Sequence, residues 1–218
     1  MPSPTSTLAI NGGPKAVHTP PGDIFKWPII TKEDEEAALE VLRAGKMSGS
    51  DVTKLFEQEF AQWHGVQHAL AHNTGTAALF GAMFGCRMGV GDELICPSMT
   101  YWASALPAFL LGSTIVFAEV CRDNLTIDPN DIEHRITRRT KAIMCVHYAG
   151  YPCDMDPILQ IARRHGVKVI EDVSHAHGAL YKGRLVGTIG DCAAMSVMSS
   201  RIIGSPPAIL RRIAVYSL

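Results

Sequence analysis

From about residue 66 onward, short apolar runs alternate with stretches of helical periodicity, and this alternation limits the possible folds more than any other feature. The apolar runs that predict strands are residues 68–71, 93–96, 114–117, 142–147 and 167–170. The intervening stretches that predict helices are residues 75–88, 102–111, 129–136 and 157–165. Such alternation is typical of βαβ crossovers, which place parallel strands in one sheet. We therefore predict an α/β fold, a mostly parallel sheet with helices on both faces.

The first 65 residues follow a different pattern. Residues 1–30 are interrupted by Gly and Pro, which predicts an irregular arm. Thr31 as N-cap, the acidic residues that follow it and Gly45 predict a helix. A second helix is predicted over residues 52–64. Its apolar stripe, which we expect to face the core, consists of Leu55, Phe56, Phe60 and Trp63.

Composition excludes several classes of protein. The chain has 20 Lys and Arg against 21 Asp and Glu, so it has no large basic footprint for nucleic acid. The most apolar window, residues 105–120, is shorter than the ~20 apolar residues of a membrane-spanning helix. Residues 1–9 lack the basic and apolar regions of a signal peptide. We therefore expect a cytoplasmic protein with no membrane partner, in which the six cysteines remain reduced.

Ligands of a parallel sheet bind beyond the carboxyl ends of its strands, so the polar segments there are candidates for a site. Gly75 allows the backbone to approach a ligand, and the free N–H groups of the helix start, with the Thr76 hydroxyl, suit a phosphate. The same segment also fits simple N-capping by Thr74 or Thr76. It is not a P-loop, because no Gly-Lys-Ser/Thr sequence follows.

Two adjacent acids, Glu171 and Asp172, follow the last predicted strand. A carboxylate there can hold a cationic ring nitrogen or a metal, or it can cap a turn. His175 and His177 come next, but no further ligands stand at metal-binding spacing, so we expect packed or hydrogen-bonded histidines and no metal. Tyr101, at a strand-to-helix turn, fits either stacking on a planar cofactor or core packing.

Five segments in order carry motifs of one family: residues 8–13, 73–79, 91–101, 171–179 and 181–191. Residues 91–101 read GDELICPSMTY and residues 171–179 read EDVSHAHGA. Over about residues 8–204 the chain resembles the DegT/StrS-type PLP-dependent sugar aminotransferases of fold type I. The resemblance implies that residues 31–200 form a partial PLP-binding large domain after the arm at 1–30.

The resemblance also implies the cofactor, pyridoxal 5′-phosphate (PLP) with pyridoxamine 5′-phosphate (PMP) as its aminated form, and the residues that hold it. Gly75, Thr76 and Ala77 would cradle the phosphate, and Ser196 would give it a hydroxyl. The implied partners are a nucleotide-linked keto-sugar, a glutamate or glutamine amine donor, and a second copy of the chain.

Three further positions take their roles from the same resemblance. Tyr101 would stack on the pyridine ring, and Asp172 would pair with its nitrogen. His175 would lie near the phenolic oxygen or the ring face of the cofactor, which makes it a candidate catalytic residue.

The sequence departs from the family at the position of the lysine that forms the Schiff base, where Arg201 stands. Arginine stays protonated and cannot form the imine, so we predict that this chain does not transaminate. Lys182 is no obvious substitute, because it belongs to a turn-like segment. We interpret residues 201–218, which contain no carboxylate side chain, as an atypical non-family tail, and we expect the family's C-terminal domain to be absent from this chain.

Three functional hypotheses follow. The first is the family activity, a PLP-dependent aminotransferase of amino-sugar and polysaccharide biosynthesis, with Arg201 making this chain inactive. The second is a non-catalytic module that binds PLP or PMP or that pairs with a full-length relative. The third, a PLP-dependent sugar dehydratase, is disfavoured because such relatives carry histidine at that position.

Overall fold

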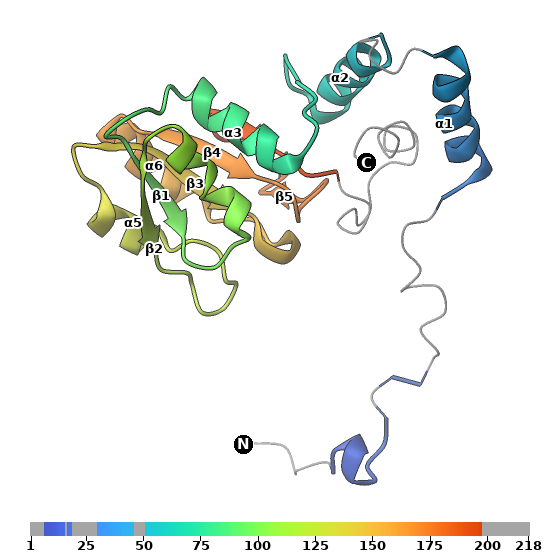
Figure 1. The fold of residues 1–218 in the computed structure, drawn as a ribbon. Helices are drawn as coiled ribbons and strands as arrows, with labels where there is room; N and C mark the ends of the chain where they lie inside the picture. Colours follow the sequence, from blue (N-terminus) through green and yellow to red (C-terminus); the bar gives the residue numbers. More distant parts are fainter. Residues whose placement is uncertain (1–6, 16, 19–29, 46–50, 198–218) are drawn as a thin grey trace.

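The computed structural model describes residues 7–15, 17–18, 30–45 and 51–197, and its centre is a parallel sheet (Figure 1). The strand order is β2-β1-β3-β4-β7. These strands are β1 (Glu93–Pro97), β2 (Thr114–Ala118), β3 (Thr140–Val146), β4 (Lys168–Asp172) and β7 (Cys192–Ala194). All four neighbouring pairs are parallel, which confirms the predicted α/β sheet. A separate antiparallel hairpin joins β5 (Leu180–Tyr181) to β6 (Arg184–Leu185).

Helices cover both faces of this sheet (Figure 1). The helices of the described residues are α1 (Lys32–Ala44), α2 (Asp51–His64), α3 (Gly75–Gly85), α4 (Pro107–Leu110), α5 (Pro129–Arg135) and α6 (Met155–His165). Short 3₁₀ turns are η1 (Ala9–Asn11), η2 (Trp102–Ser104) and η3 (Tyr148–Gly150). The layers α3/α4, sheet and α5/α6 follow from right-handed crossovers between parallel strands.

Alternation along each strand divides the core into two clusters. In β1, Leu94 packs with Leu79 and Met83 of α3, whereas Ile95 packs with Ile158 of α6. In β4, Val169 and Ile170 are likewise divided between the two clusters. Because successive side chains point to opposite faces, strands buried on both faces read as continuous apolar runs.

The predicted boundaries of α1 are confirmed by its capping. Thr31 and Asp34 form a capping box, in which the Thr31 N–H donates to Asp34 Oδ2 at 2.7 Å. Gly45 ends the helix with a φ of 65°, a left-handed conformation that favours glycine.

The aromatic stripe of α2 is not part of the core, so that prediction is wrong. Leu55 is 40% exposed, and Phe56, Phe60 and Trp63 are only half-buried. The rings pack along the helix on one another, with centroids 5.5 Å apart for Phe56–Phe60 and 5.7 Å for Phe60–Trp63. Helical periodicity identifies an apolar face, but it does not show what covers that face.

Three other predicted elements differ. Residues 68–71 form no strand, and the Ala71 N–H donates to Glu57 Oε1 at 2.9 Å instead of to a neighbouring strand. The helix expected over 102–111 is split into η2 and α4, because Pro107 starts a helix but cannot continue one. Helix α3 ends at Gly85, and Arg87 follows with a φ of 58°.

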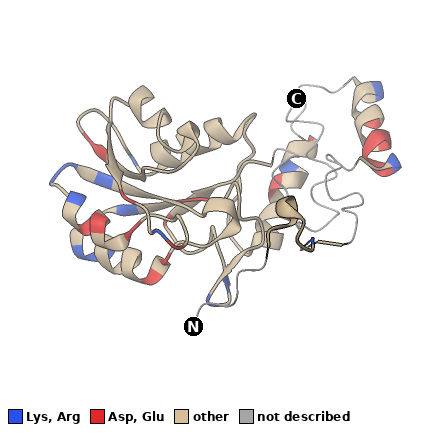
Figure 2. Cartoon of the chain, turned by 90° about the horizontal axis from the view of Figure 1, so that it is seen from below, with Lys and Arg blue, Asp and Glu red and all other residues tan. Residues whose placement is uncertain are grey.

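Basic and acidic segments lie next to each other, for example on α1, α5 and α6, whereas α3 and α4 carry no charged residue (Figure 2). Pairs such as Arg139 with Glu93 and Lys168 with Asp191, both at 2.6 Å, join the two signs. Within the described ranges, no helix is both long and apolar enough to cross a bilayer. All six cysteines are free thiols.

Candidate functional site

The carboxyl ends of β3 and β4 meet the start of α3 around a cavity of about 200 Å³. Of the residues proposed from the sequence, those lining it are Gly75, Thr76, Tyr101, Asp172, His175 and Ser196. Ala77 does not line it, and Arg201 lies outside the described residues. The cavity therefore brings together side chains from segments more than a hundred residues apart.

The start of α3 forms one wall of this cavity. Thr74 has extended backbone, and its hydroxyl accepts a hydrogen bond from the Ala77 N–H at 3.0 Å. Simple N-capping is therefore present, and it uses the N–H that the resemblance assigned to the phosphate. The N–H groups of Gly75 and Thr76, in the first turn, have no acceptor within the helix. These two N–H groups can therefore bind an anion in the cavity, in addition to the cap that Thr74 forms.

Gly75 lies against Ser196, which follows β7. A Cβ atom at position 75 would lie 2.8 Å from the Ser196 Cβ, a distance that real Cβ atoms do not show. The Ser196 N–H donates to the Ser174 hydroxyl at 3.0 Å, and His177 Nε2 lies 2.9 Å from the Ser196 carbonyl oxygen. Position 75 must therefore be glycine for this hydroxyl to reach the helix start.

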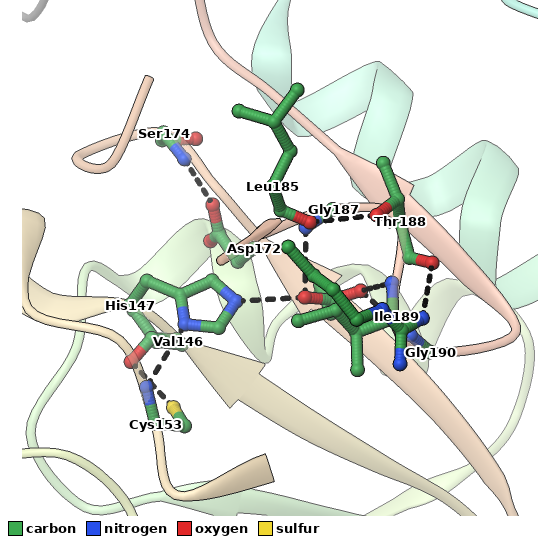
Figure 3. Close-up of polar contacts among 12 residues, drawn as sticks. Val146, His147, Cys153, Asp172, Ser174, Leu185, Gly187, Thr188, Ile189 and Gly190 are labelled. Carbon is green, nitrogen blue, oxygen red and sulfur yellow. Dashed lines mark hydrogen bonds and ion pairs between the residues drawn. The ribbon is translucent and has the colours of Figure 1, made fainter. Parts of the chain in front are cut away.

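Asp172 lines the same cavity and is only 5% exposed. Its Oδ2 accepts from the Ser104 hydroxyl at 2.7 Å. Its Oδ1 accepts from the Ser174 N–H at 3.1 Å (Figure 3). The second contact is the turn-capping role considered above. The Thr100 and Ser104 hydroxyl oxygens are 2.7 Å apart, which extends the network. A carboxylate held so rigidly in a buried place suits a positively charged ring nitrogen.

Glu171 points to the other face of the sheet. Its side chain is fully buried and accepts from the N–H groups of Gly187, Ile189 and Gly190 at 2.7–2.8 Å. His147 Nε2 lies 3.0 Å from Glu171 Oε2 (Figure 3). Burial opposes ionisation, but the hydrogen bonds from His147 and from the Gly190 and Gly187 backbone outweigh it and lower the pKa of Glu171. Glu171 therefore anchors the loop before β7 and does not reach the cavity.

The tautomer of His147 follows from its second ring nitrogen. Nδ1 accepts a hydrogen bond from the Cys153 N–H at 3.0 Å, so Nδ1 presents a lone pair (Figure 3). The ring proton is therefore on Nε2 and is donated to Glu171.

Two rings border the cavity. Tyr101 is 46% exposed, so it lines the site and is not a core residue. His175 is half-buried, and its Nδ1 accepts from the Ala149 N–H at 3.5 Å while Tyr148 packs edge-on with ring centroids 5.7 Å apart. His177 is buried and hydrogen-bonded, as expected. Among the residues that the structure describes, no group of side chains could hold a metal ion.

Lys182 lies away from this cavity, in the turn between β5 and β6. It has a φ of 50° and is followed by Gly183 with a φ of 83°, the two positive values of a tight hairpin turn. Its ammonium pairs with Asp156 at the surface. Lys182 therefore does not stand in for the missing family lysine.

Thr100, Ser104 and Ser174 support Asp172. Thr100 and Ser174 lie in the polar segments that the sequence marks as candidates after the strands, but no role was predicted for them, and Ser104 was not predicted at all. Ser104 did carry a signal, since it is a buried polar residue within the otherwise apolar stretch of residues 102–111. A polar side chain at such a place needs a hydrogen-bond partner, and here the partner lies 68 positions further along the chain.

Comparisons with known proteins identify the family of this chain. Residues 28–205 match the model of the DegT/DnrJ/EryC1/StrS aminotransferase family. The spore coat polysaccharide biosynthesis protein SpsC of Bacillus subtilis is 41% identical over 177 residues, which is 81% of this chain and 46% of SpsC. GDP-perosamine synthase of Caulobacter vibrioides is 48% identical over 148 residues, 68% of this chain and 40% of that protein. The chain thus spans less than half the length of these relatives.

Solved structures show the same likeness. An aminotransferase from Psychrobacter cryohalolentis superposes with a TM-score of 0.76 at 39% identity, over 80% of this chain and 46% of that one. NtdA from Bacillus subtilis, solved with bound PMP, superposes with a TM-score of 0.69 at 30% identity, over 75% and 38% of the two chains.

Proposed function

Because this chain belongs to the DegT/DnrJ/EryC1/StrS aminotransferase family, we propose that it is the PLP-binding part of an aminotransferase for nucleotide-linked keto-sugars. PLP, when bound, supplies an electrophilic carbonyl and an electron-accepting ring for amino-group transfer. The observation that carries the proposal is the buried carboxylate of Asp172, which lines the same cavity as the start of α3. A cationic ring nitrogen and a phosphate fit these two parts of the cavity.

The phosphate end is built by α3 and the segment after β7. The N–H groups of Gly75 and Thr76 point out of the helix start, where the helix dipole favours an anion. The Ser196 hydroxyl lies beside Gly75 and adds a donor from the neighbouring segment. These groups would bind the phosphate and so fix the position of the ring.

The ring end is built by Asp172 and its partners. Ser104 and the Ser174 N–H hold the two carboxylate oxygens, so the charge keeps one orientation. Asp172 would hold a proton on the ring nitrogen, which is the state in which the ring withdraws electrons. Tyr101, which lines the cavity, would pack against the ring and exclude water, and His175 would lie near the phenolic oxygen or the ring face.

Arg201 occupies the position of the family lysine, so the proposal for this chain is reversible PLP binding without transamination. The amine donor, glutamate or glutamine, and the nucleotide-linked sugar are the substrates of the family reaction. The six free thiols fit a reducing compartment such as the cytoplasm.

Equilibrium titration with PLP, followed by quenching of intrinsic fluorescence, tests the binding site. Asp172→Asn removes the charge that faces the ring nitrogen, so we expect at least about tenfold weaker binding, or ~1.4 kcal/mol. Asp123→Asn is the matched control, because Asp123 is an exposed acid that does not line the cavity. Equal affinities for the two variants would remove the basis of the proposal.

Borohydride reduction tests the role of position 201. In the unmodified chain with PLP, we expect no pyridoxyl label that depends on Asp172, although exposed lysines can be labelled non-specifically. In Arg201→Lys, peptide mapping should find a label at position 201 that is lost when Asp172→Asn is added. A label on another lysine of the unmodified chain that also requires Asp172 would contradict the predicted inactivity.

A non-catalytic, dimerising module is the second candidate, and exposed apolar side chains favour it. Phe84 of α3 and Phe109 and Leu110 of α4 are each more than half exposed. A second copy of this chain or a full-length relative would cover them. Sedimentation of the chain alone and mixed with a full-length family member tests this; a monomer in both samples would eliminate the candidate.

A further inference from the structure

Two cysteines that are distant in the sequence lie side by side. Cys86 directly follows α3, and Cys192 is the first residue of β7. Their sulfur atoms are 3.4 Å apart. A disulfide has a sulfur–sulfur distance of about 2.0 Å, so a relative shift of about 1.4 Å is enough to form one.

One member of the pair, Cys86, borders a second cavity at the opposite end of the sheet. This cavity has a volume of about 360 Å³, and its lining is Gly85, Cys86, Arg87, Lys141, Gly166 and Lys168. Lys141 and Lys168 stand near the amino ends of β3 and β4, whereas the first cavity lies at their carboxyl ends. A small neutral oxidant can therefore reach Cys86, although Cys86 itself is only 8% exposed.

The surroundings give the two thiols different reactivities. The hydrogen bond with Cys192 lowers the pKa of Cys86, and Lys168 and Lys141 act in the same direction, against burial and the charge of Asp191. The same hydrogen bond and burial raise the pKa of Cys192. Cys86 also borders the cavity and Cys192 does not, so Cys86 is the thiol that an oxidant reaches first and Cys192 is the thiol that resolves.

The other four cysteines lack this combination. Cys96, Cys145 and Cys153 have no exposed surface. Cys121 is partly exposed, but burial and the nearby Asp128 and Asp123 raise its pKa. None of the four lines the second cavity.

We propose that Cys86 and Cys192 are a peroxide-sensitive thiol pair that closes to a disulfide at the basic cavity. The Cys86 thiolate attacks one oxygen of hydrogen peroxide, the O–O bond breaks, and the leaving hydroxide takes up a proton to become water. The resulting Cys86 sulfenic acid is attacked by the Cys192 sulfur, which forms the S–S bond and releases a second water. Two thiols and one peroxide thus give one disulfide and two waters, a two-electron oxidation of sulfur.

The disulfide would join the end of α3 to the beginning of β7. The other end of α3 borders the first cavity, and β7 leads to Ser196 on the same cavity. Oxidation therefore restrains the two elements that together build the proposed phosphate site. The thiol chemistry itself does not depend on PLP binding, so its test is independent of the proposed function.

Peptide mapping of the 218-residue chain after hydrogen peroxide treatment and alkylation tests the proposal. We expect a disulfide-linked pair of peptides containing Cys86 and Cys192, which dithiothreitol reverses. In Cys192→Ser, Cys86 should stop as a sulfenic acid that dimedone traps, and in Cys86→Ser the cross-link should disappear. Cys121→Ser is the matched control and should retain the cross-link.

Two results would overturn the proposal: both thiols still open to alkylation after peroxide, or Cys86 over-oxidised with Cys192 untouched. Thermal unfolding of each reduced variant shows whether it is folded. If Cys192→Ser does not fold, Cys192→Ala replaces it, because alanine removes the sulfur without adding a polar group.

Discussion

The substitution Glu171→Gln removes the charge of a fully buried side chain that accepts four hydrogen bonds. Oε1 accepts from the Ile189 and Gly190 N–H groups, and Oε2 accepts from the Gly187 N–H and from His147. Each carboxylate oxygen thus faces two donors. This arrangement makes the outcome of the substitution calculable in direction and rough size.

An amide cannot satisfy these donors in either orientation. Whichever way the glutamine is turned, its NH₂ group replaces an oxygen that faces two N–H groups. His147 cannot adapt by moving its proton to Nδ1, because Nδ1 already accepts from the Cys153 N–H. Two hydrogen bonds are therefore lost. The two N–H donors that made them are left buried beside the NH₂ group of the glutamine, which is itself a donor.

Hydrogen bonds to a charged group contribute about 1.5–3 kcal/mol each, so the loss of two predicts a destabilisation of at least ~3 kcal/mol. That is a large fraction of the roughly 5–15 kcal/mol that stabilises an ordinary domain. Urea denaturation followed by circular dichroism measures it as a fall in the free energy of unfolding.

Glu133→Gln is the matched control. Glu133 is likewise a paired glutamate, with Arg164 and His165 as partners, but all three side chains are on the surface. Solvent screens such pairs, so we expect a small change in the urea midpoint. If Glu171→Gln changed stability no more than Glu133→Gln, the reasoning about its buried acceptors would be refuted.

Two further predictions come from the same residues and from the helix start. The pKa of Glu171 is lower in the folded protein than its ordinary value of about 4.5. The ionised side chain therefore stabilises the fold fully above about pH 4.5, and this stabilisation is lost as the pH falls through the folded-state pKa. Glu171→Gln should flatten this part of the profile of stability against pH. Gly75→Ala places a Cβ atom 2.8 Å from the Ser196 Cβ and should weaken PLP binding about tenfold. In Gly85→Ala, in the same helix, the new Cβ meets nothing within 4 Å, so this control should bind PLP normally. Equal PLP affinities of the two variants would contradict the close approach of Gly75 to Ser196.

Periodicity predicted the sheet well where strands are buried on both faces. The runs at 93–96, 142–147 and 167–170 all became strands, because a two-sided core requires continuous apolar sequence. Strand β7 was missed because Cys192–Ala194 is too short and its side chains are too small to stand out. Residues 68–71 have a similar apolar character but pair with no strand of the described chain. Whether an apolar run becomes a strand depends on a partner segment distant in the sequence, so the run itself carries no signal of strand pairing.

The neighbours Glu171 and Asp172 show which part of the site the sequence could predict. The residues alone predicted a carboxylate at the end of this strand, and the family resemblance chose Asp172. The alternation of side chains explains why Asp172 and not Glu171 enters the cavity. Ile170 packs beneath α3 and Val169 beneath α6, so Asp172 shares the α3 face and Glu171 the opposite one. One acid therefore faces the proposed phosphate site, and the other holds the loop that leads to β7. Neither can replace the other, because a shift of one residue along β4 would exchange both roles.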